Sequence, residues 1–150
     1  MEAATSSPSA PITGATTKIA FAGNTRLSPD LNVDFTLNSL KFDNTAGSFT
    51  LNANAGREFT FDGIVPSIIQ DSANSQLVNA PIVLNKLTFV ETSGSGDLTL
   101  AGVISGSGNA TRTGPGSLLL GGAQSNTFTG SLILDTTGTD ANVSTFFAKT

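Results

Sequence analysis

Catalysis by this chain of 150 residues would depend on carboxylates, because it contains no His, Cys, Tyr or Trp. A Ser-His-Asp triad, a Cys-His pair and a zinc site with His ligands are therefore excluded. Glycoside hydrolases use clustered Asp or Glu residues that shift one another's pKa. The aspartates closest in sequence are Asp30 with Asp34 and Asp135 with Asp140. Both pairs lie in turn-like or strand-edge segments, where Asp is common for structural reasons, so we assign no catalytic residue.

Two glycine-rich tracts are similar to ligand-binding loops. The tract "SGSGDLTL" at 93–100 resembles the calcium-binding nonapeptide of some solenoids, but those sites need tandem copies to complete the coordination shell. Gly106 and Gly108 form a Gly-x-Gly pair, yet no P-loop Lys-Ser/Thr and no predicted helix follow it. We interpret both tracts as turns and expect neither a metal nor a cofactor.

The charge distribution and hydropathy narrow the range of partners. The chain has a formal net charge of −4, and its seven basic residues are dispersed along the sequence. Without a basic stripe to meet phosphates, we expect no nucleic-acid partner. The sequence has no apolar stretch of about 18 residues, so we expect no membrane-spanning helix. The first residues lack the basic start and apolar stretch of a secretory signal, and we expect a mature or recombinant form.

Pairs of large apolar residues separated by a single residue recur from about residue 18 onward. This period of two is typical of strands with one buried face. The pairs are Ile19/Phe21, Phe35/Leu37, Leu40/Phe42, Phe49/Leu51, Phe59/Phe61, Ile82/Leu84, Leu87/Phe89, Leu98/Leu100, Leu118/Leu120 and Leu132/Leu134. The breaks between them have turn composition, and the one helical candidate, 66–81, is short, rich in β-branched residues and flanked by prolines. We therefore expect an all-β fold.

The character of the strands favours one all-β architecture over another. Strands spaced by about 8 to 12 residues fit either an antiparallel β-sandwich or a solenoid. Here they are short, mostly carry two inward residues and vary in spacing, which a solenoid tolerates because each coil contacts only its neighbours. Ten Phe without Trp or Tyr also suit a dry, narrow core. We predict a parallel β-solenoid, with the antiparallel sandwich as the alternative.

Three sets of residues are singled out for this solenoid. The predicted structural core consists of Phe59, Phe61, Leu98, Leu100, Leu118, Leu120, Leu132 and Leu134, with the leucines forming one ladder. The turn glycines are Gly106, Gly108, Gly114, Gly116 and Gly130, which allow sharp corners. Phe146 and Phe147 are adjacent and cannot both point inward on one strand, so we expect one of them to contact a partner.

The segment "GDLTLAGVISGSGNATRTGPGSLLLGGAQSNTFTGSLIL", residues 96–134, resembles the autotransporter-associated β-strand repeat of bacterial surface proteins. That family shows two Gly-x-Gly pairs, a Leu-Thr-Lys step, a Leu-Thr-Leu strand and Asn-Thr-Tyr-Thr-Gly. The matching positions here are Gly106 and Gly108, Ala110-Thr111-Arg112, Gly114 and Gly116, Leu118-Leu119-Leu120, and Asn126-Thr127-Phe128-Thr129-Gly130. Ala110 and Phe128 depart from the pattern, as does a two-residue insertion around Gln124 and Ser125. Residues 17–90 are less specifically similar to the region preceding such repeats.

This resemblance implies a right-handed parallel β-helix at the cell surface or in the medium. Proteins of the family usually serve as stalks or adhesive scaffolds, so we expect a non-enzymatic extracellular module of a bacterial surface protein. Its partner would be a host surface or a matrix polysaccharide. A β-helix polysaccharide lyase or hydrolase is the alternative from the enzyme class.

The two ends of the chain suggest a further alternative. We expect residues 1–16 to form an extended Ser/Pro/Thr-rich tail and residues 17–150 to form one solenoid domain. The end of a β-helix leaves backbone N–H and C=O groups unpaired, and such edges recruit strands. The tail, or the C-terminal "ANVSTFFAKT", could therefore add to a second copy and give a homo-oligomer or a head-to-tail filament.

Overall fold

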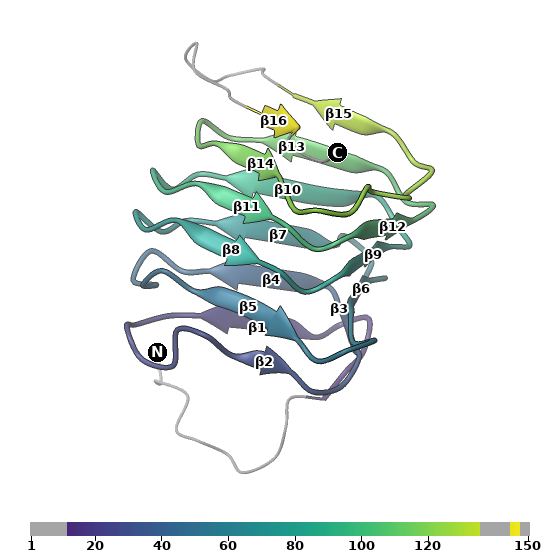
Figure 1. The fold of residues 1–150 in the computed structure, drawn as a ribbon. Helices are drawn as coiled ribbons and strands as arrows, with labels where there is room; N and C mark the ends of the chain where they lie inside the picture. Colours follow the sequence, from purple (N-terminus) through teal and green to yellow (C-terminus); the bar gives the residue numbers. More distant parts are fainter. Residues whose placement is uncertain (1–11, 136–144, 148–150) are drawn as a thin grey trace.

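The computed structural model describes residues 12–135 and 145–147, and in that part of the chain it contains strands but no helix (Figure 1). Every strand pairs in parallel with strands one coil away. The coils stack into a β-solenoid of about five turns. The predicted solenoid is therefore confirmed, and the antiparallel sandwich is wrong. The described residues include no helix long and apolar enough to cross a membrane.

Three parallel sheets run along the solenoid. Sheet 1 consists of β1 (Lys18–Phe21), β4 (Ser39–Phe42), β7 (Ser67–Gln70), β10 (Thr88–Thr92), β13 (Ala110–Thr113) and β15 (Leu132–Leu134). Sheet 2 consists of β2 (Asp30–Leu31), β5 (Thr50–Ala53), β8 (Gln76–Val78), β11 (Leu98–Leu100), β14 (Leu118–Leu120) and β16 (Thr145–Phe147). Sheet 3 consists of β3 (Phe35–Leu37), β6 (Phe59–Phe61), β9 (Ile82–Leu84) and β12 (Ile104–Gly106).

The coils differ in length because their corners differ. Ser39 pairs with Lys18 of the preceding coil and with Ser67 of the following coil. The step from Ser39 to Ser67 is 28 residues, whereas the later steps along sheet 1 are 22 residues, as from Asp71 to Ser93. The longer coil contains three enlarged corners, 43–49, 54–58 and 62–66, where most other coils have shorter ones. Larger corners extend outward and leave the strand register intact.

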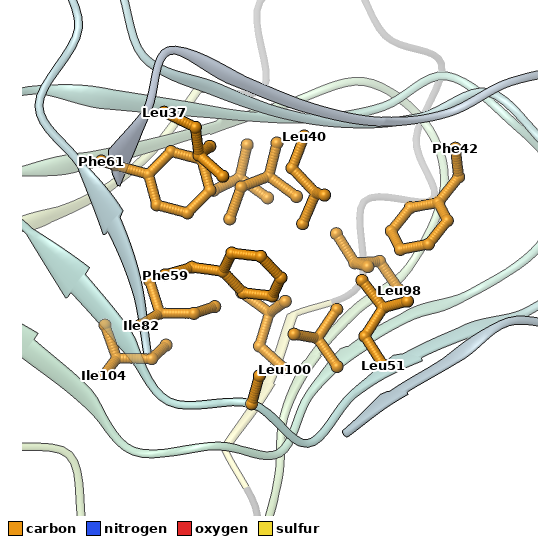
Figure 2. Close-up of a cluster of buried hydrophobic side chains, with 14 of the residues drawn as sticks. Leu37, Leu40, Phe42, Leu51, Phe59, Phe61, Ile82, Leu98, Leu100 and Ile104 are labelled. Atoms are coloured by element: carbon orange, nitrogen blue, oxygen red, sulfur yellow. The ribbon is translucent and has the colours of Figure 1, made fainter. Parts of the chain in front are cut away.

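All three sheets contribute side chains to one apolar interior (Figure 2). Six of the predicted core residues are buried there: Phe59, Phe61, Leu98, Leu100, Leu118 and Leu120. Leu98 lies in register with Leu118 in sheet 2, and Phe59 with Phe35 in sheet 3. Strand alternation therefore places equivalent side chains directly above one another from coil to coil.

The last pair of the predicted leucine ladder departs from this arrangement. Leu134 is 45% exposed, so its assignment to the core is wrong, and Leu132 is only partly buried against the core. Both belong to β15, which pairs with β13 in sheet 1, so they do not continue the ladder of sheet 2. β15 is the terminal strand of sheet 1 in the described part of the chain, which leaves Leu134 without a further coil to cover it.

The predicted alternation is also out of phase in β10. The buried side chains are Thr88, Val90 and Thr92, whereas Leu87 is 43% exposed and Phe89 lies on the outer register. The two buried threonines donate hydrogen bonds to main-chain oxygens at the corners, Thr88 to Lys86 and Thr92 to Gly116. These bonds satisfy the hydroxyl groups, so Thr88 and Thr92 can point inward. The apolar pattern had instead placed Leu87 and Phe89 on the inward face.

The five turn glycines meet two different requirements. Gly106 and Gly114 have φ values of 96° and 91°, in the left-handed region that favours glycine. Gly108, Gly116 and Gly130 do not have positive φ. At these three positions, a Cβ atom would collide with the backbone of the preceding coil. Their absence of a side chain therefore permits close stacking of successive corners.

The described part of the predicted tail lies along the first edge of sheet 3. Gly14 N donates to Thr36 O at 2.8 Å, and Thr36 N donates to Thr13 Oγ1 at 2.7 Å. Asn38 N donates to Thr17 O at 2.7 Å. Residues 12–17 thus precede β1 as part of the same coil path, whereas residues 1–11 lie outside the described residues.

Candidate functional site

The two aspartate pairs considered for catalysis are placed differently by the structure. Asp30 lies in β2 and is exposed, and Asp34 forms an ion pair with Arg57 of the next coil, with 3.3 Å between Oδ2 and Nη1. Asp135 directly follows β15, and Asp140 lies outside the described residues. Within the described ranges, no three acidic side chains gather closely enough to hold a metal ion.

The most connected polar group on the outer surface is a cluster of Lys41, Asp71 and Ser93, which the sequence analysis missed. Lys41 Nζ lies 2.5 Å from Asp71 Oδ2, and the Ser93 hydroxyl donates a hydrogen bond to Asp71 Oδ1. Lys41 belongs to β4, Asp71 directly follows β7, and Ser93 directly follows β10. The Lys41–Asp71–Ser93 cluster therefore connects three successive coils, near the C-terminal ends of three adjacent strands of sheet 1.

The electrostatics of this cluster keep both charged groups ionised. The hydrogen bond with Asp71 raises the pKa of Lys41, and the nearby charges of Asp43 and Glu91 act in the same direction. Partial burial alone would raise the pKa of Asp71, but the hydrogen bonds from Lys41 and Ser93 together outweigh burial and lower it. A carboxylate with a lowered pKa is a weak general base, and a lysine with a raised pKa is a weak nucleophile. The arrangement is suited to joining coils.

A second polar group is buried inside the corner that follows β7. Gln70 is fully buried, and its Nε2 lies within 3.1 Å of the main-chain oxygens of Ser72, Asn74 and Gly96. Its Oε1 accepts a hydrogen bond from Ser72 N at 3.0 Å. One amide side chain thus satisfies main-chain groups of its own corner and of the corner one coil later.

The same corner also satisfies the carbonyl groups of the preceding coil. Ser72 Oγ and Asn74 Nδ2 both donate to Ala46 O, at 2.6 and 2.9 Å. Gln76 Nε2 donates to Gly47 O at 2.9 Å, and Phe49 N donates to Gln76 Oε1 at 2.9 Å. Buried main-chain groups are costly when unpaired, so these side chains allow the preceding corner to pack against the core.

Arg112 lies two coils later and also binds a main-chain oxygen of a corner, but its side chain is charged. Its side chain is fully buried, and Nη2 donates to Thr92 Oγ1 at 3.0 Å and to Gly116 O. Among the described residues, its Nε and Nη1 atoms have no hydrogen-bond partner. Burial lowers the pKa of the guanidinium. Arg112 therefore supports the corner that contains Gly116 while carrying an incompletely compensated charge.

Phe146 and Phe147 belong to β16, which is the last strand of sheet 2 in the part of the chain that the structure describes. The register pairs Phe146 with Leu119 and Phe147 with Leu120, so the two residues alternate between the outer and inner register positions. The side chains of β16 lie outside the described residues, and the expected partner contact stays a prediction.

Different sequence signals accompany these polar groups. Asp71 and Ser93 are 22 residues apart, the spacing of the later coils in sheet 1, so an alignment of the chain with itself at that period brings them together. Lys41 and Asp71 are separated by the longer coil, and their contact depends on the enlarged corners within it. Glutamine and arginine at inward strand positions carry no such signal, because the same residue types are common on solvated faces.

The comparisons with known proteins provide no relative whose role could be transferred to this chain. Comparisons with family models, with curated proteins and with solved structures found no match to this chain.

Proposed function

We propose that this chain is a non-catalytic, extracellular structural or adhesive scaffold module of a bacterial surface protein. The proposal rests on two features. Residues 96–134 resemble the autotransporter-associated repeat, and charged side chains on the surface join one coil to the next. The repeat supplies the extracellular part of the proposal. The geometry of the described residues supports the scaffold part.

The observation that carries the scaffold role is the direction of the ion pairs. Lys41–Asp71, Arg57–Asp34 and Lys86–Asp62 each join one coil to the next, with N–O distances of 2.5, 3.3 and 3.9 Å. The charged side chains therefore bridge successive coils between residues 34 and 86, and each pair adds up to about 1 kcal/mol to their association. Such a surface favours a rod that keeps its shape under load, and repeated coils add length without changing the local packing.

An adhesive role would use the outer faces of the sheets. Phe89 lies on the outer register of sheet 1, between Ser67 and Thr111 of the adjacent strands. Half-buried aromatic and hydroxyl groups on a flat parallel sheet can meet a polysaccharide through apolar contact and hydrogen bonds. A host surface or matrix polysaccharide is therefore the partner that we propose for this module.

The proposal is tested by display on a bacterial surface. Cells that carry the chain between an export signal and an outer anchor should bind a polysaccharide-coated surface more strongly than cells carrying Leu118→Asp, which removes the fold. Phe89→Ser should reduce binding while leaving the amount of displayed chain unchanged. Antibodies against the chain should label intact cells of the organism that makes it.

Two results would contradict the proposal. Release of new reducing ends or unsaturated sugars from the polysaccharide, dependent on the folded chain, would indicate a lyase or hydrolase. Labelling of the native cells only after permeabilisation would place the chain inside them.

A further inference from the structure

At both ends of the described solenoid, the chain passes through sheet 3, sheet 1 and sheet 2 in the same order. At the N-terminal end, residues 13–17 lie against β3 of sheet 3 and are followed by β1 in sheet 1 and β2 in sheet 2. At the other end, Thr127 N and Thr129 N donate to Ile104 O and Gly106 O of sheet 3, both at 2.9 Å. β15 in sheet 1 and β16 in sheet 2 follow. Within residues 12–135 and 145–147, the coil path therefore begins on sheet 3 and ends on sheet 2, and sheet 3 is the next position along the spiral.

The strand edges at these two ends have main-chain groups that face along the solenoid axis. Phe21 O and Thr17 O accept hydrogen bonds from the second coil, so the alternate residues Lys18 and Ala20 direct their N–H and C=O groups the other way. Asp135 N and Ser131 O bond to β13, which directs the main-chain groups of Leu134 away from it. Within the described residues, β1 and β15 are the outer strands of sheet 1.

Apolar surface accompanies both edges. A cavity of about 280 Å³ lies at the N-terminal coil, and its walls are mostly apolar: Ile19, Phe21, Pro29, Leu31, Phe35 and Phe59 are among the lining residues. At the opposite end, Ile133 and Leu134 of β15 are 47% and 45% exposed. This cavity is partly open to solvent, so a further coil packed against it would remove its apolar walls from water.

We propose that the C-terminal edge of one copy binds the N-terminal edge of a second copy and continues the stack of coils in register. β15 would pair with β1 and β16 with β2. The inner column of sheet 1, which contains Leu40, Ile68, Val90 and Arg112, would continue from Leu134 to Ile19 of the second copy. The contact extends the coil-to-coil interface that already joins every strand of sheet 1. The proposal stands on this geometry and does not depend on an extracellular location or on adhesion.

This contact joins two different surfaces, so it does not close on itself. A head-to-tail interface without rotational closure produces an open filament. Each copy can therefore bind one neighbour at each end, and a copy that lacks one functional edge terminates the filament. That property gives a test that distinguishes edge pairing from non-specific association.

The experiment uses the full chain and two variants, each with one altered edge. Ala20→Pro removes an N–H that faces the proposed neighbour while leaving the bonds to β4 in place. Leu134→Lys places a charge on the opposite edge, at a side chain that is already 45% exposed. By analytical ultracentrifugation, the mass of the wild-type chain should rise with concentration above the 15.2 kDa of one copy. Each variant alone should stay a monomer, and an equimolar mixture should form dimers and nothing larger.

The control is Ile64→Lys, which alters a 92% exposed apolar side chain at a lateral corner. This variant should assemble as the wild type does. Circular dichroism and thermal unfolding establish that each variant is folded, and Lys18→Pro replaces Ala20→Pro if the latter does not fold. A wild-type chain that stays monomeric at all concentrations, a mixture that stays monomeric, or loss of assembly in Ile64→Lys would overturn the proposal.

Discussion

The hydroxyl group of Ser93 donates a hydrogen bond to the carboxylate of Asp71, 22 residues earlier and one coil away. The same carboxylate pairs with Lys41 of the coil before. One acidic side chain thus receives donors from both neighbouring coils. Parallel stacking makes this possible, because it aligns residues that are one coil length apart in the sequence.

Asp71→Asn should lower the free energy of unfolding at pH 7 by about 0.2 to 1 kcal/mol, the usual range for an exposed ion pair. The pKa of Asp71 in the folded state is below its ordinary value of 3.8. The contribution of the carboxylate is therefore fully present above pH 3.8 and is lost as the pH falls through the folded-state pKa. Urea unfolding of both proteins between pH 2 and 7 should show the difference disappearing at the acidic end.

The same comparison of unfolding free energies, extended to pH values above 10, reports on Lys41. Its pKa in the folded state is above 10.5, so its contribution is present below pH 10.5 and is lost as the pH rises through the folded-state value. Asp30→Asn is the matched control, because Asp30 has no ion pair within the described residues. An equal loss of stability in both variants would show that the ion pair makes no specific contribution.

Gly116→Ala should destabilise the protein by about 1 to 3 kcal/mol, the range for an overpacked site. A Cβ at this position would lie 2.7 Å from Gly94 O, a main-chain atom of the preceding coil that cannot rotate away. Gly121→Ala is the control, since its Cβ would meet its nearest neighbour, a side chain, at 3.5 Å. Thermal unfolding should separate the two variants, and equal melting temperatures would exclude close stacking as the requirement at Gly116.

Leu118→Asp should prevent folding, because an unpaired buried carboxylate costs several kcal/mol against a total stability of roughly 5 to 15 kcal/mol. Leu118 is 1% exposed, whereas the adjacent Leu119 lies on the outer register and is half-buried. Leu119→Asp should therefore fold, with a smaller loss of stability. Circular dichroism measures both, and a folded Leu118→Asp would contradict the assignment of this column to the core.

Strand alternation predicted the burial of Phe59 and Leu118 because both lie in strands whose inward neighbours are also apolar. It failed in β10, where Thr88 and Thr92 are buried and their hydroxyl groups donate hydrogen bonds to main-chain oxygens at the corners. A pattern of apolar residues does not indicate such bonds. Leu134 was misplaced for another reason. Its pattern is that of a core residue, but its exposure depends on which strand lies beyond β15.

The polar groups were harder to predict than the core. To predict the contact between Lys41 and Asp71, one would need the lengths of the corners between them. These lengths are irregular and leave the strand register unchanged. Gln76 reaches Gly47 and Phe49 only because the two corners stack. Such contacts follow from the summed length of a coil, whereas the alternation within a strand is a local property.

Gln76→Leu should destabilise the protein by about 2 to 6 kcal/mol, because it leaves two buried main-chain groups unpaired at about 1 to 3 kcal/mol each. The groups are Gly47 O and Phe49 N, which bond to the amide of Gln76. Gln124→Leu, at an exposed position, is the control and should change stability little. Urea unfolding compares the two, and a Gln76→Leu protein as stable as the wild type would show that water or a rearranged corner replaces the lost bonds.

Arg112→Met should leave the protein as stable as the wild type or raise its stability by about 1 kcal/mol. Two guanidinium nitrogens of Arg112 are buried without partners in the described part of the chain. Removing this incompletely compensated charge offsets the loss of the bonds to Thr92 and Gly116. Arg112→Ala is the matched comparison, since it removes the same charge but leaves a cavity, and it should be less stable than Arg112→Met by about 2 kcal/mol or more. Thermal unfolding ranks the three proteins. A strong loss of stability in Arg112→Met would show that the two hydrogen bonds at this corner outweigh the penalty for burying the charge.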